Sequence, residues 1–305
     1  MFATLRVVIT SGDDALTTDA FDVFDDLTET TTGLLNQSHY HDLITLFVET
    51  AQSASFDNAV RIRALVFIQW VARYKRKTLK KTGLLAPLVA VLLRIMSDEP
   101  LDSEAGANGD SDDDDDDEED KPSDAASQTL DTFALYLAAD DFMPFVMTEI
   151  RGLMSSGSPA QQRACMMAIV IIAEGCLEFV SDHMDDFLAY LYAGLASASM
   201  SVRATACMAV SAVSEADGMA QHHAQLLPAL AQVLATSNEN VQDKCCVAIE
   251  RYCEQMGEDV VHYMDGILKA LGGLLSGTSN RQIHESVICA IGSVAHAAEG
   301  VRLED

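Results

Sequence analysis

The chain has 305 residues and a net charge of −28; 49% of its residues are hydrophobic and only 6% are aromatic. Ala, Leu, Val and Met supply most of the apolar residues, which favours closely packed helices over a β-sandwich. A field of this sign repels nucleic acid and anionic membranes, and it attracts polybasic proteins.

The first third of the sequence predicts amphipathic helices of two kinds, A and B, that pair as antiparallel hairpins. Residues 1–10 resemble the end of an A helix, residues 41–51 (HDLITLFVETA) predict an A helix, and residues 58–74 (NAVRIRALVFIQWVARY) predict the following B helix. Trp70, the only tryptophan, lies near the end of this B helix. It is a candidate aromatic anchor on a binding face, although packing in the core is the alternative.

The next segment, RYKRKTLKK, gathers six of the 19 basic residues between Arg73 and Lys81. Three interpretations are open: a nucleic acid site, a contact for the acidic run that follows, and a solvated loop. The negative field of the chain opposes the first of these, so we expect no direct binding of nucleic acid.

A strongly acidic segment separates the next two predicted helices, an A helix at residues 83–97 and a B helix at residues 126–140. Between Ser97 and Asp124 stand 15 acidic residues and one Lys, so this segment carries −15 + 1 = −14, half of the net charge. If Phe67 and Ala134 are equivalent positions, their separation of 67 residues exceeds a normal period of about 40 by roughly 27. The sequence therefore predicts a disordered acidic loop, residues 97–124, inserted within one repeat.

Nine consecutive carboxylates in this loop are candidate binding residues for a basic partner, and a solubilising linker is the alternative. They are Asp112, Asp113, Asp114, Asp115, Asp116, Asp117, Glu118, Glu119 and Asp120.

Four segments near the C-terminus superpose on one another: RACMMAIVIIAEG, ATACMAVSAVSEA, KCCVAIERYCEQ and SVICAIGSVAHAA. Their matching residues, here called register residues, are spaced 41, 39 and 42 apart: Ala168, Ala209, Ala248 and Ala290. Second apolar helices lie between these blocks, and paired helices at this period are the signature of HEAT and armadillo solenoids. We predict an all-α, right-handed HEAT-repeat solenoid of about seven hairpins, the first and last incomplete, at residues 1–96 and 125–305.

Four glutamates in the second half of the predicted B helices are candidate binding residues on the concave face of this solenoid. Acids at a helix C-terminus oppose the helix dipole, so helix stability does not account for them. They form a possible track for a basic ligand, and a solvated face is the alternative: Glu174, Glu215, Glu250 and Glu254.

Other site types lack support in the sequence. The seven cysteines are odd in number and include no CxxC pair, which indicates reduced core thiols in a reducing compartment. The histidines lack zinc-like spacing, and nothing assembles a nucleophile, a base and an oxyanion hole. The longest wholly apolar run has ten residues, against about 20 for a membrane span. We expect a soluble intracellular protein that is not an enzyme and has no cofactor, metal or membrane association.

The sequence NAVRIRALVFIQWVARYKRKTLKK, followed by LLAPLVAVLLRIMSDEP and the acidic run, resembles the importin-β (karyopherin-β) nuclear transport receptors, in particular their importin-4-like branch. SPAQQRACMMAIVIIAEG and SVRATACMAVSAVSEA match the next repeats of that branch in order, and the resemblance runs from about Phe21 to Ala298. The chain would be an internal fragment of a receptor about three times as long.

The resemblance implies a monomeric receptor that shuttles between cytoplasm and nucleus, contacts nucleoporins, and releases its cargo on binding Ran-GTP. It implies that the acidic loop contacts Ran or basic cargo, and that B helices form the cargo surface. We therefore expect this segment to bind basic proteins such as histones or ribosomal proteins. The alternative is a HEAT-repeat scaffold that assembles a multi-subunit complex.

Overall fold

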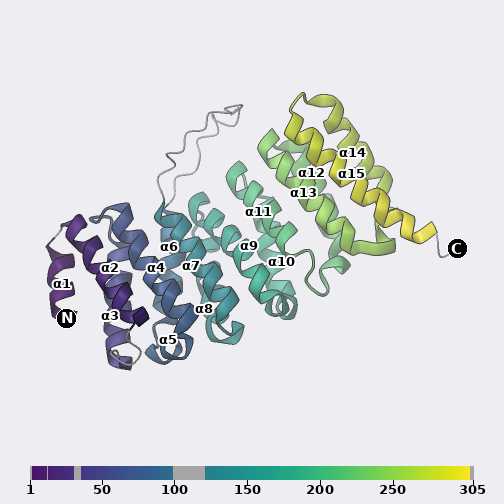
Figure 1. The fold of residues 1–305 in the computed structure, drawn as a ribbon. Coiled ribbons are helices and arrows are strands. Elements are labelled where there is room, and N and C mark those ends of the chain that lie inside the picture. Colours follow the sequence, from purple (N-terminus) through teal and green to yellow (C-terminus); the bar gives the residue numbers. More distant parts are fainter. Residues whose placement is uncertain (1, 12, 31–35, 99–120, 303–305) are drawn as a thin grey trace. The chain divides into compact units, whose positions relative to one another are not determined.

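The computed structural model describes residues 2–11, 13–30, 36–98 and 121–302. Within these ranges the chain forms fifteen α-helices and two short 3₁₀ helices, with no strand (Figure 1). The helices fall into two compact units. Unit 1 holds helices α1–α8 and unit 2 holds helices α9–α15, and each is a stack of helical hairpins, so the all-α prediction is confirmed.

Unit 1 confirms the predicted alternation of A and B helices. Apolar residues at helical spacing, such as Val60, Ala64, Phe67 and Val71, form the buried face of α4, and this face packs against α3 and α7. The bounds of the eight helices are α1 Phe2–Thr10, α2 Asp14–Thr30, α3 Gln37–Gln52, α4 Asn58–Tyr74, α5 Arg76–Thr82, α6 Leu85–Ser97, α7 Pro122–Tyr136 and α8 Ala139–Ser155.

The basic segment after α4 is a short helix, so its interpretation as a solvated loop is wrong. Helix α5 begins at Arg76, directly after Lys75, and ends before Gly83, whose φ of 72° is left-handed. The segment has no amphipathic period of its own that would reveal a helix. It is held instead by tertiary burial, because Leu79 is fully buried and α5 packs against α3.

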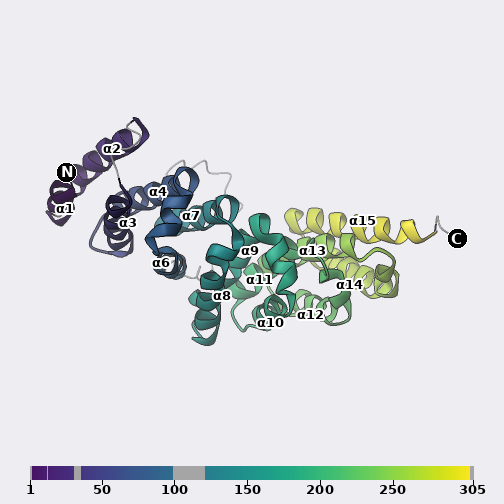
Figure 2. The ribbon, with the colours of Figure 1, turned by 90° about the horizontal axis from the view of Figure 1, so that it is seen from below.

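Unit 2 alternates two rows of helices in chain order (Figure 2). Each B helix packs against the next B helix, and each A helix packs against the next A helix. The B row consists of α9 Pro159–Asp182, α11 Met200–Val213, α13 Glu239–Met256 and α15 Arg281–Arg302, and the A row of α10 Met184–Leu195, α12 His223–Thr236 and α14 Met264–Gly277.

The four register alanines occupy equivalent places in this stack. Ala168, Ala209, Ala248 and Ala290 are each 0% exposed, and they lie on four consecutive B helices. Small side chains at these positions let neighbouring B helices approach closely. The repeat register read from the sequence is therefore the packing register of unit 2.

A polar contact that joins the two helices of a hairpin recurs in both units, and the sequence reading missed it. The fourth residue of a B helix donates a hydrogen bond to a backbone carbonyl in the last turn of its A helix or just beyond it, where carbonyls have no partner within the helix. In four repeats this residue stands six positions before the register residue. The contacts are Arg61 Nε to Ala51 O at 2.9 Å, Arg203 Nε to Ser197 O at 2.5 Å, Gln242 Nε2 to Leu234 O at 2.9 Å, and His284 Nε2 to Thr278 O at 2.9 Å.

Helix α9 is, among the described residues, long and apolar enough to cross a membrane by length and composition. Half of the apolar stretch of α9 is buried inside the structure, and the helix packs against α10 and α11. Its exposed side carries Glu174. A core helix of a helical stack has this same composition, so the finding is weak support for a membrane span.

Candidate functional site

The predicted acidic loop lies outside the described residues, so the roles of Asp112–Asp120 stay a prediction. The helices on either side are described: α6 ends at Ser97 and α7 begins at Pro122. Of the residues that the prediction assigned to the loop, Ser97 belongs to α6 and residues 122–124 belong to α7, where Ser123 is buried. The acidic run connects an A helix to the B helix that packs against it.

Three of the predicted glutamates are exposed at equivalent sequence positions of three consecutive repeats in unit 2, two of them on a B helix and one in the turn that follows a B helix. Glu174, Glu215 and Glu254 each stand six residues beyond a register alanine, and all three are exposed. Glu174 and Glu215 make no hydrogen bond or ion pair with any described residue. We call these three residues the carboxylate row.

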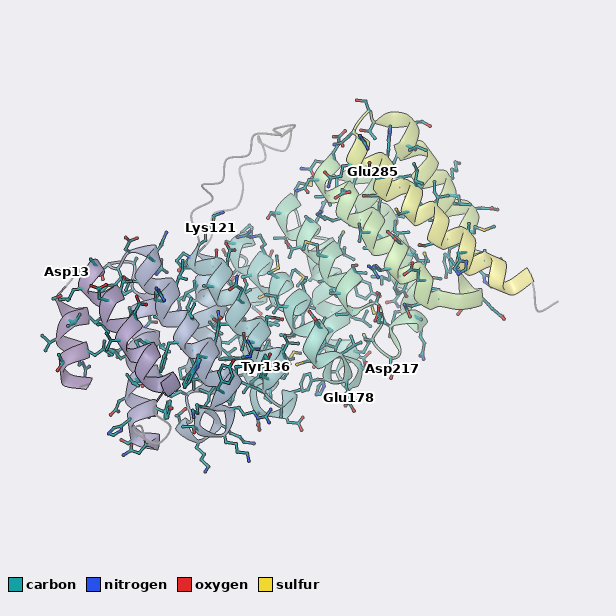
Figure 3. The ribbon with its side chains drawn as sticks, in the orientation of Figure 1. Asp13, Lys121, Tyr136, Glu178, Asp217 and Glu285 are labelled. Carbon is teal, nitrogen blue, oxygen red and sulfur yellow. The ribbon has the colours of Figure 1, made fainter. Side chains whose placement is uncertain are left out.

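The prediction that Glu215 lies in a B helix is wrong. Helix α11 ends at Val213, so Glu215 lies in the turn that follows and not in the helix. The Ser214 hydroxyl donates to the Ser211 carbonyl at 2.8 Å, and Gly218, with a φ of 86°, completes the turn. Asp217, labelled in Figure 3, belongs to this turn as well.

Glu250 and Glu254 share one side of α13, as their spacing of four residues predicts. Glu250 is half-buried, whereas Glu254 is exposed and accepts a hydrogen bond of 3.0 Å from the Ser293 hydroxyl of α15. Glu254 thus has a partner in the next repeat, and it is a weaker candidate for an unoccupied ligand contact than Glu174 or Glu215.

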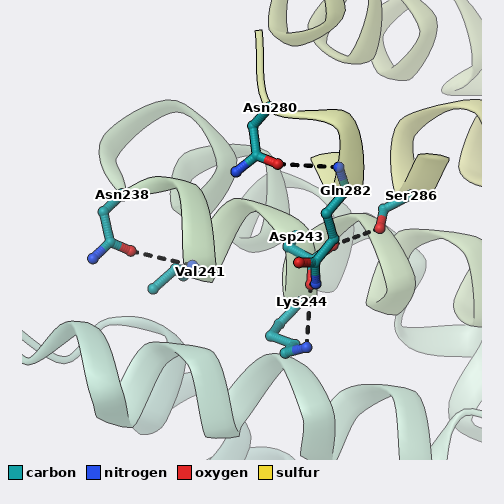
Figure 4. Close-up of polar contacts among 7 residues, drawn as sticks. All are labelled: Asn238, Val241, Asp243, Lys244, Asn280, Gln282 and Ser286. Atoms are coloured by element: carbon teal, nitrogen blue, oxygen red, sulfur yellow. Dashed lines mark hydrogen bonds and ion pairs between the residues drawn. The ribbon is translucent and has the colours of Figure 1, made fainter. Parts of the chain in front are cut away.

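Two further carboxylates of α13 bind the next repeat, and sequence reasoning missed both. Asp243 is only 5% exposed and accepts hydrogen bonds from Lys244 Nζ at 3.1 Å, Gln282 Nε2 at 3.1 Å and Ser286 Oγ at 2.5 Å (Figure 4). Such donors are what a buried carboxylate requires. Asp243 therefore joins α13 to α15 and is not available to a ligand.

Glu239 performs a similar role at the start of α13. It accepts hydrogen bonds from Thr278 Oγ1 at 2.7 Å and from Asn280 Nδ2 at 3.1 Å. These bonds favour the charged form, so the pKa of Glu239 is lowered, chiefly by Asn280 and then by Thr278. In the sequence Glu239 cannot be distinguished from a glutamate that binds a ligand. Its hydrogen bonds to Thr278 and Asn280 show that it joins two repeats.

Trp70 belongs to unit 1, whereas the carboxylate row belongs to unit 2. It is half-buried in a series of aromatic contacts that runs from the core to the surface. The ring centroids are 4.8 Å apart for Phe21–Phe47, 4.4 Å for Phe47–Phe67, 6.1 Å for Phe67–Trp70 and 5.8 Å for Trp70–Tyr74. Trp70 thus combines core packing with a partly exposed surface, and its role as an anchor stays a prediction.

In unit 1, the position of α4 that corresponds to the carboxylate row is occupied by a basic residue. Six positions beyond Phe67, the register residue of α4, stands Arg73, and it is exposed. The spacing of six residues between Phe67 and Arg73 is visible in the sequence. As for metals, the described residues contain no group of three or more His, Cys, Asp or Glu that could hold an ion.

Comparisons with known proteins agree with this architecture. The family model described as the HEAT-like repeat matches residues 159–213 and 201–252. The crystal structure of Kap121p bound to Pho4p superposes on 97% of this chain with a TM-score of 0.87 and 23% identity, and the match covers 30% of that protein. The structure of Kap121p bound to Nup53p gives the same TM-score. The fold is an all-α HEAT-repeat solenoid.

Two sequence relatives are more informative about the kind of HEAT-repeat protein. The chain is 26% identical to the probable importin subunit beta-4 of Schizosaccharomyces pombe over 302 residues, 98% of this chain and 27% of the relative. It is also 26% identical to human importin-4 over 94% of this chain and 27% of that protein. The chain is therefore similar to importin-4 and importin subunit beta-4 along nearly its whole length, and it spans about a quarter of the length of these relatives.

Proposed function

We propose that this chain is the cargo-binding part of a nuclear import receptor, and that its carboxylate row binds a basic segment of the cargo. One observation supports the proposal: three consecutive repeats of unit 2 carry an exposed glutamate six residues beyond the register alanine, namely Glu174, Glu215 and Glu254. Two of these carboxylates have no partner among the described residues. Basic segments of histones or ribosomal proteins have the complementary charge.

The remaining partners follow from the relatives. Kap121p has been crystallised with Pho4p and with Nup53p, and the sequence relatives are named importins. For the longer protein we propose cargo and nucleoporin binding, shuttling between cytoplasm and nucleus, and release of cargo by Ran-GTP. The acidic run Asp112–Asp120 is proposed to strengthen the encounter with basic cargo, since an excess of negative charge steers association.

The spacing of the row suggests how a ligand would lie on it. Packed neighbouring helices have axes about 8–10 Å apart. A peptide in the polyproline II conformation has three residues per turn and rises about 3.1 Å per residue, so every third side chain points the same way at intervals of about 9 Å. We expect a lysine at every third position to meet successive carboxylates of the row.

The experiment is a titration, followed by fluorescence anisotropy, with a labelled peptide that carries Lys at every third position. Glu174→Gln, Glu215→Gln and Glu254→Gln together should weaken binding about tenfold, since each exposed pair contributes roughly 0.5 kcal/mol and about 1.4 kcal/mol is a factor of ten. The matched control neutralises three exposed acids of the A helices, outside the row, namely Asp185→Asn, Asp186→Asn and Asp265→Asn.

A second peptide carries the same number of lysines in one block. Comparison of the two peptides distinguishes recognition of the lysine spacing from general electrostatic attraction. The spaced peptide should bind the native chain more tightly, and the two peptides should bind the row variant equally. Equal loss of affinity in the row variant and in the control variant would contradict a site at the row. It would leave only a diffuse negative field.

A further inference from the structure

A basic surface in unit 1 is not used by the proposed function. Seven residues at the end of α4 and along α5 form it, and they include all six cations of the segment. Arg76, Lys77, Lys80 and Lys81 belong to α5, and all four are exposed. The basic surface consists of Arg73, Tyr74, Lys75, Arg76, Lys77, Lys80 and Lys81.

Two of its cations are fixed by aromatic rings. The Cζ atom of Arg73 lies 5.4 Å from the ring centroid of Tyr74 and 5.3 Å from that of Tyr136. Tyr136 is the last residue of α7, and Figure 3 labels it. Lys75 Nζ lies 5.9 Å from the ring of Trp70. Cation–π contacts hold each charge in place, so less side-chain entropy is lost when a ligand binds.

The cations of α5 differ in whether they form an ion pair within the structure. Lys80 forms an ion pair of 2.5 Å with Asp141. Arg76 and Lys77 are exposed, and neither forms an ion pair with any described residue. Two adjacent cations without an ion pair to a described residue stand out in a chain with 19 basic and 47 acidic residues.

We propose that the basic surface binds an acidic peptide segment of a partner protein. Arg73, Arg76 and Lys77 supply donors for carboxylates, and guanidinium groups bind carboxylates through two parallel hydrogen bonds. Tyr74 is 59% exposed and offers an apolar contact beside these charges. The partner segment therefore carries several Asp or Glu residues next to an apolar side chain.

The arrangement favours an acidic peptide over single-stranded nucleic acid. Nucleic acid sites of this size stack bases on open aromatic faces. In this surface the half-buried rings of Trp70 and Tyr136 are already in contact with Lys75 or Arg73, so Tyr74 is the one ring of the three that is exposed. The net charge of −28 also repels a polyanion far longer than the basic surface.

The test is a titration of the chain with a labelled Glu-rich peptide that contains one central Leu. Its control is the same peptide with every Glu replaced by Gln. Arg76→Glu with Lys77→Glu should weaken binding of the Glu-rich peptide by about tenfold or more. Arg151→Glu with Lys269→Glu changes the charge equally at exposed positions elsewhere and should leave the affinity within about twofold.

Two more variants examine the aromatic contacts. Tyr136→Ala removes one ring beside Arg73 and should weaken binding about threefold, in line with an exposed cation–π contact. Trp70 is the only tryptophan and lies beside Lys75, so its emission should change as the peptide binds. Unaltered Trp70 emission in the unliganded variants shows that they remain folded.

Three results would overturn the proposal. The first is equal affinity for the Glu and Gln peptides. The second is tighter binding of single-stranded oligothymidylate of equal charge, which would assign the surface to nucleic acid. The third is binding that arises only when Asp112–Asp120 are changed to Asn and Gln, which would assign the surface to the chain's own acidic run.

Discussion

Units 1 and 2 share one plan of paired helices but are built with different side chains. The core of unit 1 is aromatic, with Phe47, Phe67, Phe133 and Phe142 almost fully buried. The B helices of unit 2 pack through alanine and cysteine, as at Ala209 and the neighbouring buried thiols. The position six residues beyond the register residue differs as well, since α4 is followed there by Arg73, whereas unit 2 carries the carboxylate row. The hairpin plan thus fixes where side chains lie, while the residue type decides what each unit can bind.

Each unit also carries its own probe. Trp70 lies in unit 1, and all seven cysteines lie in unit 2. Tryptophan fluorescence therefore follows the unfolding of unit 1, and thiol reactivity follows the opening of unit 2. The comparison of the two units can be tested in a single chain.

The largest expected effect is that of Phe47→Ala in unit 1. Phe47 is 1% exposed and contacts both Phe21 and Phe67, so its loss should lower the free energy of unfolding by about 3–5 kcal/mol. The Trp70 transition should shift to lower denaturant concentration, and thiol protection in unit 2 should persist. Phe145→Ala, at a position 37% exposed, is the control and should cost far less. Equal shifts of both probes would show that the units unfold together.

A smaller effect is expected from Gly194→Ala in unit 2. A Cβ at Gly194 would lie 2.8 Å from Met166 Sδ and 2.9 Å from the Ala206 Cβ, and overpacking of this kind costs about 1–3 kcal/mol. Buried thiols should react faster, while the Trp70 transition stays in place. Gly272→Ala, where no atom lies within 4 Å, should instead stabilise its helix by up to about 1 kcal/mol. The same result for both variants would rule out close packing as the cause.

The third prediction concerns the thiols of unit 2 and needs no mutation. Cys289 is exposed and the other six cysteines are buried, so a thiol reagent should label one residue rapidly in the native chain. Burial raises the pKa of Cys176 to about 11, and the pKa values of Cys246 and Cys253 to about 12.

The raised pKa values also predict how the stability of unit 2 changes at alkaline pH. Thiols of the unfolded chain ionise near pH 9.0, whereas the buried thiols stay protonated to higher pH. The stability linked to them is present in full below pH 9 and is lost as the pH rises toward 12. Denaturant titrations at increasing pH should show this loss in unit 2 before unit 1. Rapid labelling of several thiols at neutral pH would contradict the buried, protonated state.

Helical pairing and register could be predicted from the sequence because they follow from apolar spacing. Ala168, Ala209, Ala248 and Ala290 mark buried positions, and the period alone identifies them. Glu174 and Glu254 could be placed on their helices for the same reason.

What the sequence could not show depends on contacts between segments distant in the chain. Helix α5 exists because Leu79 is buried against neighbouring helices. Glu215 leaves its helix because the turn at Gly218 begins early. Asp243 and Glu239 look like the other acids of α13, and only the facing donors of the next repeat distinguish them. Arg73 could have been found by extending the register from unit 2 into unit 1.

The most direct test of the central claim is to locate a bound basic peptide on the chain. A peptide with Lys at every third position and a photo-crosslinker at its centre would be irradiated in the complex, and the attached residues identified by mass spectrometry. The account predicts attachment to α9, α11, α13 and the turn at Glu215. Attachment mainly to the A helices α10, α12 and α14, or to unit 1, would contradict a binding site at the carboxylate row.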